Sequence, residues 1–384
     1  MLTAQQIVSF YSNKKGLVMD FNQFYNSNFV KNHLQHDAML QSNGSIDFSR
    51  AVSFEISKEL YAEADAKGMT LTELLESDEY DPSGINSPLD AFERQLVLAG
   101  IKLAGKSSTT VEQFYQQAPA LLPEFMMREV KKGMSMRPEL GKLIANTTTI
   151  ASNSYTPFYI NTDNSSKFSL RPIGDGSEVP QLLVTEQNHA VNVVDYGLAL
   201  KTSYKALRYR TTSQFRVLLW YIGFKIQTDK IGLLVDCIIN GDGNNNSASV
   251  VNTASTGTLT YDDLITLWSN FSPFEMNTII CHVNQLKSIL TLSEFKDPMA
   301  GYRFQNSGEL FSPLGAGLVR SDEVPTDLVI GLDNRFAVEE VITQPLMIEY
   351  DKVIDQRFEE AVISESVSYA KILKEAAIVL DTNY

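Results

Sequence analysis

The stretch YRTTSQFRVLLWYIGFKIQTDKIGLLVDCIINGDG, Tyr209–Gly243, predicts one long helix. Thr211 is a candidate N-cap with Gln214 three residues further on, which is the spacing of a capping box. Asn240–Gly241 gives the stop, because Asn and Gly tolerate the left-handed conformation that ends helices. The helix should cover residues 211–240, a length of roughly 43 Å at ~1.5 Å per residue.

Apolar residues recur at helical spacing along this stretch, and only Asp229 and Lys230 interrupt the stripe. The repeating positions are Phe215, Leu218, Leu219, Ile222, Ile226, Leu233, Leu234, Cys237 and Ile238. A helix of this length exceeds the usual globular helix, and no coiled-coil heptad runs through it. It therefore needs an equally long partner surface in the fold.

The composition is that of a soluble globular protein: 384 residues, 43% hydrophobic and 20% charged, enough for two or three compact units. The net charge of −14 comes without a Lys/Arg block, which argues against general affinity for nucleic acid, because neutralising phosphates needs clustered cations. We see no signal-peptide pattern at the start and no run of 18 apolar residues, so we expect cytoplasmic synthesis and no membrane span. Cys237 and Cys281 lie in apolar stretches and should be reduced and buried.

Upstream of the long helix, residues 1–120 show short helical patterns broken by turns, as expected of an arm that packs on something else. Helices are predicted within Gly68–Gly84, Ser87–Gly100 and Thr109–Gln117. Pro123–Lys142 predicts a helix, a Gly/Pro break and a second helical start.

Residues 146–201 change in character, because Thr, Ser, Tyr, Val and Asn dominate and apolar residues alternate with polar ones. The pattern predicts strands on either side of a polar stretch, Asn161–Gln181, and so a projecting hairpin. A two-stranded arm is marginally stable alone in water. We expect it to become ordered mainly by lying on a neighbouring molecule.

After the long helix, helices and strands alternate, which predicts a compact α/β lobe. Thr260–Phe271 should be a helix, Asn277–Leu292 a strand leading into a helix, and Leu328–Leu332 a buried strand. The following C-terminal part should contain a loop and a long strand with two different sides. One side would carry Ile363, Val367 and Tyr369, and the other Ser364, Ser366 and Ser368.

The sharpest chemical motif is GIKLAGKS, Gly100–Ser107, a full match to the phosphate-binding pattern G-x-x-x-x-G-K-[ST]. A phosphate loop needs a buried strand before it, whereas the preceding DAFERQLVL has helical spacing and charges. Leu328–Asp333 could supply the strand and Asp on the Mg²⁺ side. A nucleotide hydrolase is therefore the alternative from a different functional class, and our expectation is a protein that is not an enzyme.

The histidines show no ligand spacing with the cysteines, so we predict no zinc site. They are His33, His36, His189 and His282. NGDGNNN, Asn240–Asn246, lacks the spaced carboxylates and closing Glu of a calcium loop and is interpreted as a helix stop. We predict no catalytic, cofactor-binding or metal-binding residues and no cofactor.

Taken in order, many stretches resemble the major capsid protein of tailed bacteriophages (Caudoviricetes), of the Hong Kong 97 type, a fold shared with encapsulin nanocompartments. The resemblance runs from about residue 65 to the C-terminus. The matching stretches are LDAFERQL with AGIKL, LPEFMMREV, ANTTTI, GSEVPQ, YGLALKTSYKALRYR, the long helix ending NGDG, TLTYDDLITLW, LSEFKDPMAGYRFQ, SPLGAGLVRSDEVP, LVIGLDNRFA and VIDQRFEEAVISESVSYAKILKEAAIVL. Each stretch alone is weak evidence for the resemblance, whereas the occurrence of all of them in this order is strong evidence.

The resemblance implies an α+β, Hong Kong 97-like fold of four parts. They are an N-terminal helical arm, 1–120; a peripheral domain, 121–146, 204–254 and 341–373, with the spine helix 211–240; an extended β-hairpin loop, 147–203; and an axial α/β domain, 255–340 and 374–384. The strand 361–373 would run beside the spine helix.

The implied function is self-assembly into pentamers and hexamers that form the icosahedral head of a tailed double-stranded DNA bacteriophage. The chain would be made in the host cytoplasm and end in the virion, with scaffolding, portal and decoration proteins as partners and no membrane. DNA would be enclosed without sequence-specific binding, and the negative charge suits a lumen that does not trap it. An encapsulin-like shell around an enzyme cargo is the alternative within the same class.

Lys167 and Arg171 lie on the predicted extended loop and are candidate inter-subunit contacts. Some members of the family join subunits covalently through a Lys on this loop and an Asn on the neighbour. The segment Tyr350–Phe358 contains no Asn, so we expect no such cross-link here.

Overall fold

The computed structural model describes residues 57, 59–77, 79–80, 89–103, 108–160, 172–175, 184–203, 209–296, 314–353 and 358–384. The chain divides into two compact units. The first comprises Met1–Gly133, Leu198–Gly223 and Ile348–Ile363; the second comprises Met134–Gly197, Phe224–Met347 and Ser364–Tyr384. The predicted division into arm, peripheral domain, extended loop and axial domain stays a prediction.

The long helix is present as α10, Thr212–Asn240, with 29 residues. The Gln214 N–H donates to Thr211 Oγ1 at 3.3 Å, so Thr211 caps the helix as predicted. Gly241 follows the last turn with φ +84°, the left-handed conformation expected of the stop. Both ends of the helix are therefore confirmed.

The predicted upstream helices are also confirmed. The described helices before α10 are α4 (Glu59–Ala66), α5 (Leu71–Leu75), α6 (Ala91–Leu98), α7 (Val111–Gln117) and α8 (Leu122–Ser135). Capping boxes start three of them, with Thr70, Asp90 and Thr110 as N-caps. Short 3₁₀ turns occupy Pro119–Leu121 and Leu140–Lys142, the second of which is the predicted new start after the break.

Helices α8 and α10 cross closely in the first unit. A Cβ atom on Gly133 would lie 2.3 Å from the backbone oxygen of Trp220, so only glycine permits this approach. Glu129 secures the crossing, because it accepts from the Trp220 indole N–H at 2.6 Å and pairs with Arg216 at 2.9 Å. The rings of Phe114 and Phe125 pack in the same unit, with centroids 5.5 Å apart.

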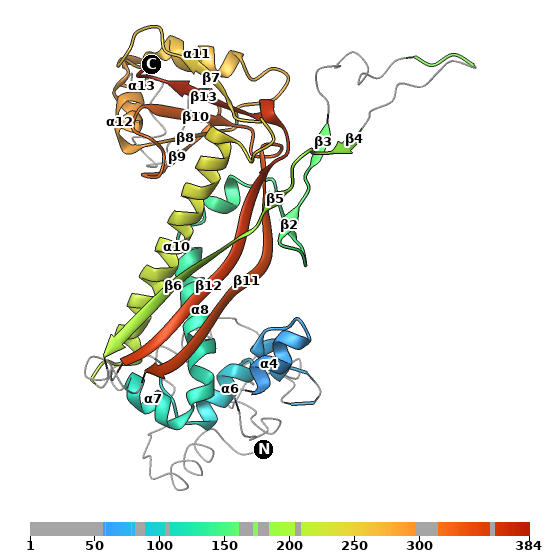
Figure 1. Ribbon diagram of the computed structural model, residues 1–384. Coiled ribbons are helices and arrows are strands. Elements are labelled where there is room, and N and C mark those ends of the chain that lie inside the picture. The colour runs from blue at the N-terminus through green and yellow to red at the C-terminus, as the bar shows by residue number, and fades with distance from the viewer. Residues whose placement is uncertain are drawn as a thin grey trace, which may run out of the picture. The chain divides into compact units, whose positions relative to one another are not determined.

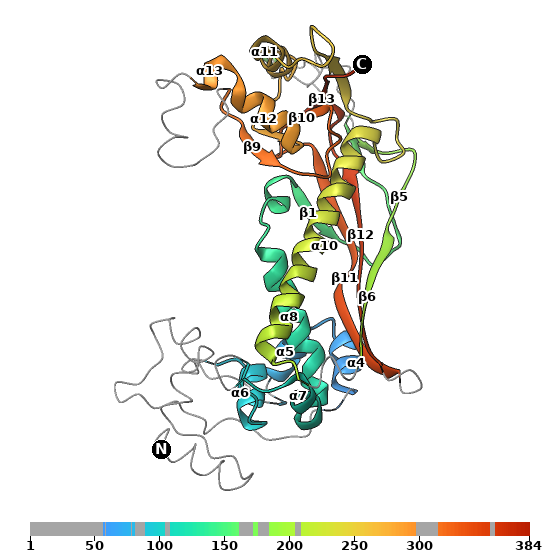
Figure 2. The same ribbon diagram turned by 90° about the vertical axis from the view of Figure 1, so that its left-hand side faces the viewer.

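A four-stranded sheet provides the long partner surface, and Figures 1 and 2 show its strands beside α10. Its order is β1-β11-β12-β6. The strands are β1 (Asn146–Thr149), β11 (Val338–Val353), β12 (Phe358–Lys371) and β6 (Val194–Ser203). β1 pairs parallel to the start of β11, with Asn146 opposite Glu339.

Strand β12 confirms the predicted two-sided strand, because Ile363, Val367 and Tyr369 are all buried. Strand β11 is a correction, since the sequence was expected to form a loop through much of this region. Pro345 obscured the strand. It lies beyond Ile342, the last β11 residue paired with β1, so its missing N–H breaks no bond of that ladder.

In the region of the predicted hairpin, the structure contains two short antiparallel ladders. They are β2 (Ser154–Tyr155) with β5 (Val191–Asn192), and β3 (Phe158–Ile160) with β4 (Val184–Glu186). We call these four strands the ribbon. The strands flanking it in sequence, β1 and β6, belong to the four-stranded sheet.

The predicted α/β lobe contains a five-stranded sheet of order β7-β13-β10-β8-β9. Its strands are β7 (Ser249–Asn252), β8 (Thr278–Cys281), β9 (Gly317–Arg320), β10 (Leu328–Leu332) and β13 (Ala377–Asp381), accompanied by α11 (Tyr261–Ser269), α12 (Val283–Thr291) and α13 (Ser293–Lys296). The helix 261–269, the strand–helix pair 278–291 and the buried strand 328–332 are thus confirmed.

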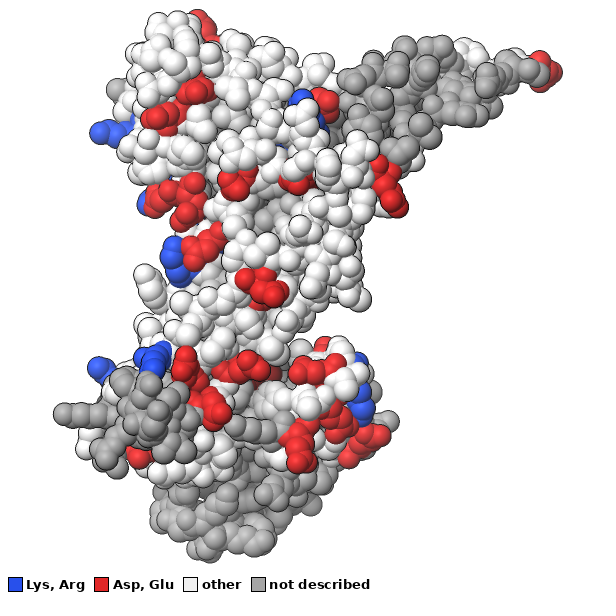
Figure 3. Space-filling view, viewed as in Figure 1, with Lys and Arg blue, Asp and Glu red and all other residues white. Residues whose placement is uncertain are grey.

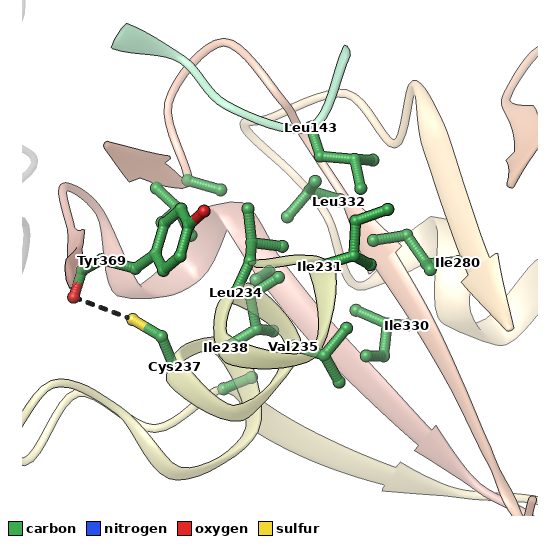
Figure 4. Close-up of a cluster of buried hydrophobic side chains, with 14 of the residues drawn as sticks. Leu143, Ile231, Leu234, Val235, Cys237, Ile238, Ile280, Ile330, Leu332 and Tyr369 are labelled. Atoms are coloured by element: carbon green, nitrogen blue, oxygen red, sulfur yellow. Dashed lines mark hydrogen bonds between the residues drawn. The ribbon is translucent and has the colours of Figure 1, made fainter. Parts of the chain in front are cut away.

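Alternate residues of the central strands enter two different apolar cores. Ile280 and Ile330 pack with Ile231, Leu234 and Ile238 of α10, as Figure 4 shows. Their neighbours in sequence face the other way, into a core that α11 and α12 supply, containing Ile279, Cys281, Val329, Leu264, Leu267 and Ile289. The sheet is therefore covered on both faces, and the α+β class is confirmed.

Candidate assembly surfaces

The sequence alone did not show what the side chain of Lys230, in α10, contacts. Its Nζ lies 2.8 Å from both Glu340 of β11 and Glu365 of β12. Lys230 is only 7% exposed, and both glutamates are buried. What interrupted the apolar stripe is thus a buried cation that joins the helix to two strands. The available signal was Glu365, which shares the buried side of β12 with Ile363 and Val367.

The neighbouring carboxylates favour the charged form of Lys230. Burial alone would lower the pKa of Lys230, but the adjacent carboxylates of Glu340 and Glu365 raise it above its ordinary value. The Tyr369 hydroxyl donates to Glu340 at 3.2 Å, and burial and that carboxylate raise the pKa of the phenol. Asp229, the other polar residue in the stripe, instead pairs with Lys225 on the surface.

A second buried lysine closes the C-terminal end of α10. Lys371 Nζ donates to the backbone oxygens of Ile238 at 3.1 Å and Asn246 at 2.7 Å. Burial lowers its pKa to about 8. A donor at this position satisfies a carbonyl that the helix leaves without an internal partner. The segment Asn240–Asn246 is therefore a helix stop, as predicted.

The ribbon and β6 expose apolar side chains. Phe158 of β3 is 66% exposed and Val184 of β4 is 47% exposed. Along β6, three exposed apolar residues alternate and therefore share one face of the strand: Val194, Tyr196 and Leu198. Covering such side chains with a partner molecule lowers the free energy, because apolar surface is removed from water.

Helices in each unit add further exposed apolar residues. In the first unit, Val217, Leu218 and Tyr221 lie on the exposed side of α10. In the second, Ile265 and Trp268 lie three residues apart on α11, away from buried Leu264 and Leu267. Figure 3 shows that Asp and Glu are more prominent than Lys and Arg on the face drawn there.

Several predicted site residues lie outside the described residues. They are Lys167, Arg171, His33 and His36. Of the phosphate-loop motif, 104–107 also lie outside; the described part, Gly100–Leu103, follows helix α6 and not a strand, and α7 begins only at Val111. Asp333, the alternative Mg²⁺ ligand, is buried, and its Oδ1 accepts from the Arg335 Nε–H at 2.9 Å.

The other predicted residues have local structural contacts. His282 caps α12, and His189 bonds through its backbone to Asn244. Cys237 and Cys281 are free and buried, as predicted, and burial raises the pKa of each thiol to about 12. Within the described ranges, no group of three or more His, Cys, Asp or Glu could hold a metal ion.

In the described part of the chain, we find no helix that is both long and apolar enough to span a bilayer. The fold defines an α+β protein with a long helix backed by an extended sheet, an α/β lobe and a ribbon that exposes apolar residues.

Structure comparison finds likenesses among shell proteins. The capsid of a native GTA particle is 14% identical with a TM-score of 0.48, over 66% of this chain and 91% of that one. A virus-like particle from Pyrococcus furiosus is 14% identical with a TM-score of 0.45, over 67% and 98%. The SrpI encapsulin of Synechococcus elongatus is 14% identical with a TM-score of 0.45, over 64% and 88%. No family model and no curated protein matches the sequence. The resemblance to capsid and encapsulin proteins expected from the sequence is thus also found between structures.

Proposed function

We propose that this chain is a major capsid protein, whose copies form pentamers and hexamers and close into the icosahedral head of a tailed double-stranded DNA bacteriophage. The observation that carries the proposal is the exposed ribbon. Its β3–β4 ladder pairs with neither larger sheet, while Phe158 and Val184 face solvent. Because a two-stranded ladder is marginal in water, a surface on another copy would stabilise it.

Further support comes from apolar residues on separate elements. Closed rings need two different complementary surfaces on each copy, because head-to-tail contacts join unlike faces. Three surfaces expose apolar side chains for such contacts: the ribbon, the side of α10 at Val217 and Tyr221, and the outer side of α11 at Trp268. A self-associating shell protein accounts for all three.

The proposal is tested by expressing the chain alone and examining it by negative-stain electron microscopy and light scattering. We expect closed shells or ring-shaped oligomers. A compact monomer at high concentration, with the ribbon's amides protected from exchange, would refute the proposal. Particles isolated from infected cells should hold nuclease-resistant DNA. A protein cargo without DNA would instead support the encapsulin alternative.

The enclosed DNA would be confined rather than bound. The net charge is −14, so the average electrostatic force on phosphates is repulsive. We expect that dispersed subunits do not retard a DNA duplex in gel electrophoresis at physiological salt. Scaffolding, portal and decoration proteins would be the other partners, and synthesis in the host bacterial cytoplasm would precede entry into the virion.

Lys167 and Arg171 are proposed inter-subunit contacts of the extended loop. Replacing both by Ala should raise the concentration needed for assembly, because two cations that could pair with a neighbour's acids are lost. Lys287→Ala, an exposed lysine on α12, is the control. If the double variant, the control and the wild type assemble at the same concentration, Lys167 and Arg171 are not interface residues.

We propose no enzymatic role for Gly100–Ser107, because α6 stands where a phosphate loop needs a strand. Wild-type protein and Lys106→Ala should show the same thermal stability with and without Mg²⁺ and ATP. Stabilisation by nucleotide of the wild type alone would contradict this.

A further inference from the structure

The turn between β4 and β5 is bonded to the loop that follows α10. The His189 N–H donates to Asn244 Oδ1 at 2.9 Å, and Asn244 Nδ2 donates back to the His189 carbonyl at 3.0 Å. The two residues are 55 positions apart in the sequence. One side chain thus satisfies both main-chain groups of His189, which lies in the turn between the ribbon strands β4 and β5.

A carboxamide suits this task because it holds an acceptor and a donor side by side. It pairs with His189 as a residue of a neighbouring strand would. A carboxylate at this position would keep the acceptor but lose the donor. Alanine would lose both.

The contact continues from Asn244 to the end of α10. Asn244 Nδ2 also donates to Asp242 Oδ1 at 3.0 Å, and Asp242 Oδ2 accepts from the backbone N–H of Lys371 at 2.9 Å. Lys371 in turn donates to the Ile238 carbonyl. A continuous chain of hydrogen bonds therefore connects the turn between β4 and β5, the last turn of α10 and the end of β12.

The ribbon needs such a support. The β2–β5 ladder at its base has only two residue pairs, Ser154 with Asn192 and Tyr155 with Val191. Buried Val191 packs with Val341 and Ala370 and so fixes the position of β5. Ile150, Tyr155 and Val193 are partly buried against the same cluster. Apolar packing is non-directional, and so leaves the angle of the segment beyond it weakly determined.

We propose that Asn244 is a positioning residue that fixes the direction of the ribbon relative to the C-terminal end of α10. The consequence for a shell rests on the proposed function, because the ribbon's direction would decide where it meets the next copy. The hydrogen-bonded contact between Asn244 and His189, here called the joint, is a property of the single chain. The two claims can therefore fail separately.

Hydrogen exchange at the His189 amide tests the joint. Asn244→Ala should raise its exchange rate about tenfold or more, because the acceptor is lost. Asn244→Asp retains the acceptor and should keep that amide protected. Asn240→Ala is the matched control, since Asn240 is the exposed last residue of α10, four positions before Asn244, and among the described contacts its side chain bonds only to Asp236. Unchanged exchange in Asn244→Ala would overturn the proposal.

Distances between spin labels test the direction. Labels at Glu186→Cys on the ribbon and Asp229→Cys on α10 occupy exposed sites, and both native thiols are buried. Labelled chain is diluted into unlabelled chain so that only intramolecular pairs are measured. Asn244→Ala and Asn244→Asp should both broaden or shift the distance distribution, whereas Asn240→Ala should not. An unchanged distribution in both Asn244 variants would refute a positioning role, and failure of the wild type to form shells would refute only the proposed function.

Discussion

The five-stranded sheet and the ribbon belong to the same compact unit, but their apolar side chains are covered to different extents. Every residue of β8 is buried, and two apolar cores cover the sheet on opposite faces. The ribbon has two strands at each level and leaves Phe158 and Val184 exposed. The lobe therefore obtains its stability within one chain, whereas the β3–β4 part of the ribbon has exposed apolar side chains that, under the proposed function, another copy would cover.

The strongest test of this contrast removes one aromatic ring from each region. Phe271 is fully buried in the core beneath α11, so Phe271→Ala should lower the free energy of unfolding by about 3–5 kcal/mol. Phe158→Ala should change it by less than about 0.5 kcal/mol in the dispersed chain, because the ring is exposed. Denaturant unfolding measures both. A large loss from Phe158→Ala would show that the ribbon is packed within its own chain.

Lys230 tests whether the four-stranded sheet depends on its buried charges. Lys230→Ala should destabilise the dispersed chain by about 3–4 kcal/mol, because two buried carboxylates lose their cation. Lys225→Ala removes an exposed ion pair on the same helix and should cost less than about 0.5 kcal/mol.

Combining Lys230→Met with Glu340→Gln and Glu365→Gln should recover much of the lost stability, since no unpaired charge remains. Equal effects of Lys230→Ala and Lys225→Ala would show that the cluster does not secure the helix.

Lys371 predicts a pH dependence at the joint between helix and sheet. Its folded pKa of about 8 lies below the ordinary value of 10.5, so the unfolded chain binds more protons between these values. Stability should therefore rise from pH 8 to pH 10, by on the order of 2–3 kcal/mol from this group. Lys371→Met should remove that rise, whereas Lys287→Met on the surface should retain it. Parallel pH profiles for wild type and Lys371→Met would contradict the assignment.

The smallest effect concerns Phe158 during assembly. If a neighbouring copy covers the ring, Phe158→Ala should weaken each contact by about 1–2 kcal/mol and raise the concentration at which shells appear. Light scattering against protein concentration gives the shift. An unchanged threshold would mean that the ring stays in water after assembly.

Signals that are local in sequence predicted much of the fold. Thr211 and Gly241, which were named from the sequence, mark the ends of α10 through contacts within a few residues. The capping boxes at Thr70, Asp90 and Thr110 are equally local, but they were found only in the structure. The apolar run Leu328–Leu332 similarly indicated a buried strand. These elements could be predicted because the contacts that stabilise them join residues that are close together in the sequence.

What the sequence did not reveal depends on distant partners. Lys230 and Glu365 are 135 positions apart, so the lysine looked like a polar interruption until the strand was placed. Asn244 was interpreted only as part of the helix stop Asn240–Asn246, because its bonds to His189 cannot be foreseen without the path of the ribbon. Strand β11 was concealed by Pro345, whose tolerance depends on which side of the strand is paired.

The position of β13 has a consequence for how the protein is made. β13 lies between β7 and β10, although it follows both in the chain, and β7 finds its partner only there. While residues 377–381 are still inside the ribosome, β7 has no ladder to join and β10 lacks a neighbour. Closing the lobe thus has to wait for the synthesis of residues 377–381, because contacts between segments distant in sequence form only after the later segment is made. A polypeptide cut short before residue 377 would leave the place between β7 and β10 empty, so that β7 would have no strand to pair with.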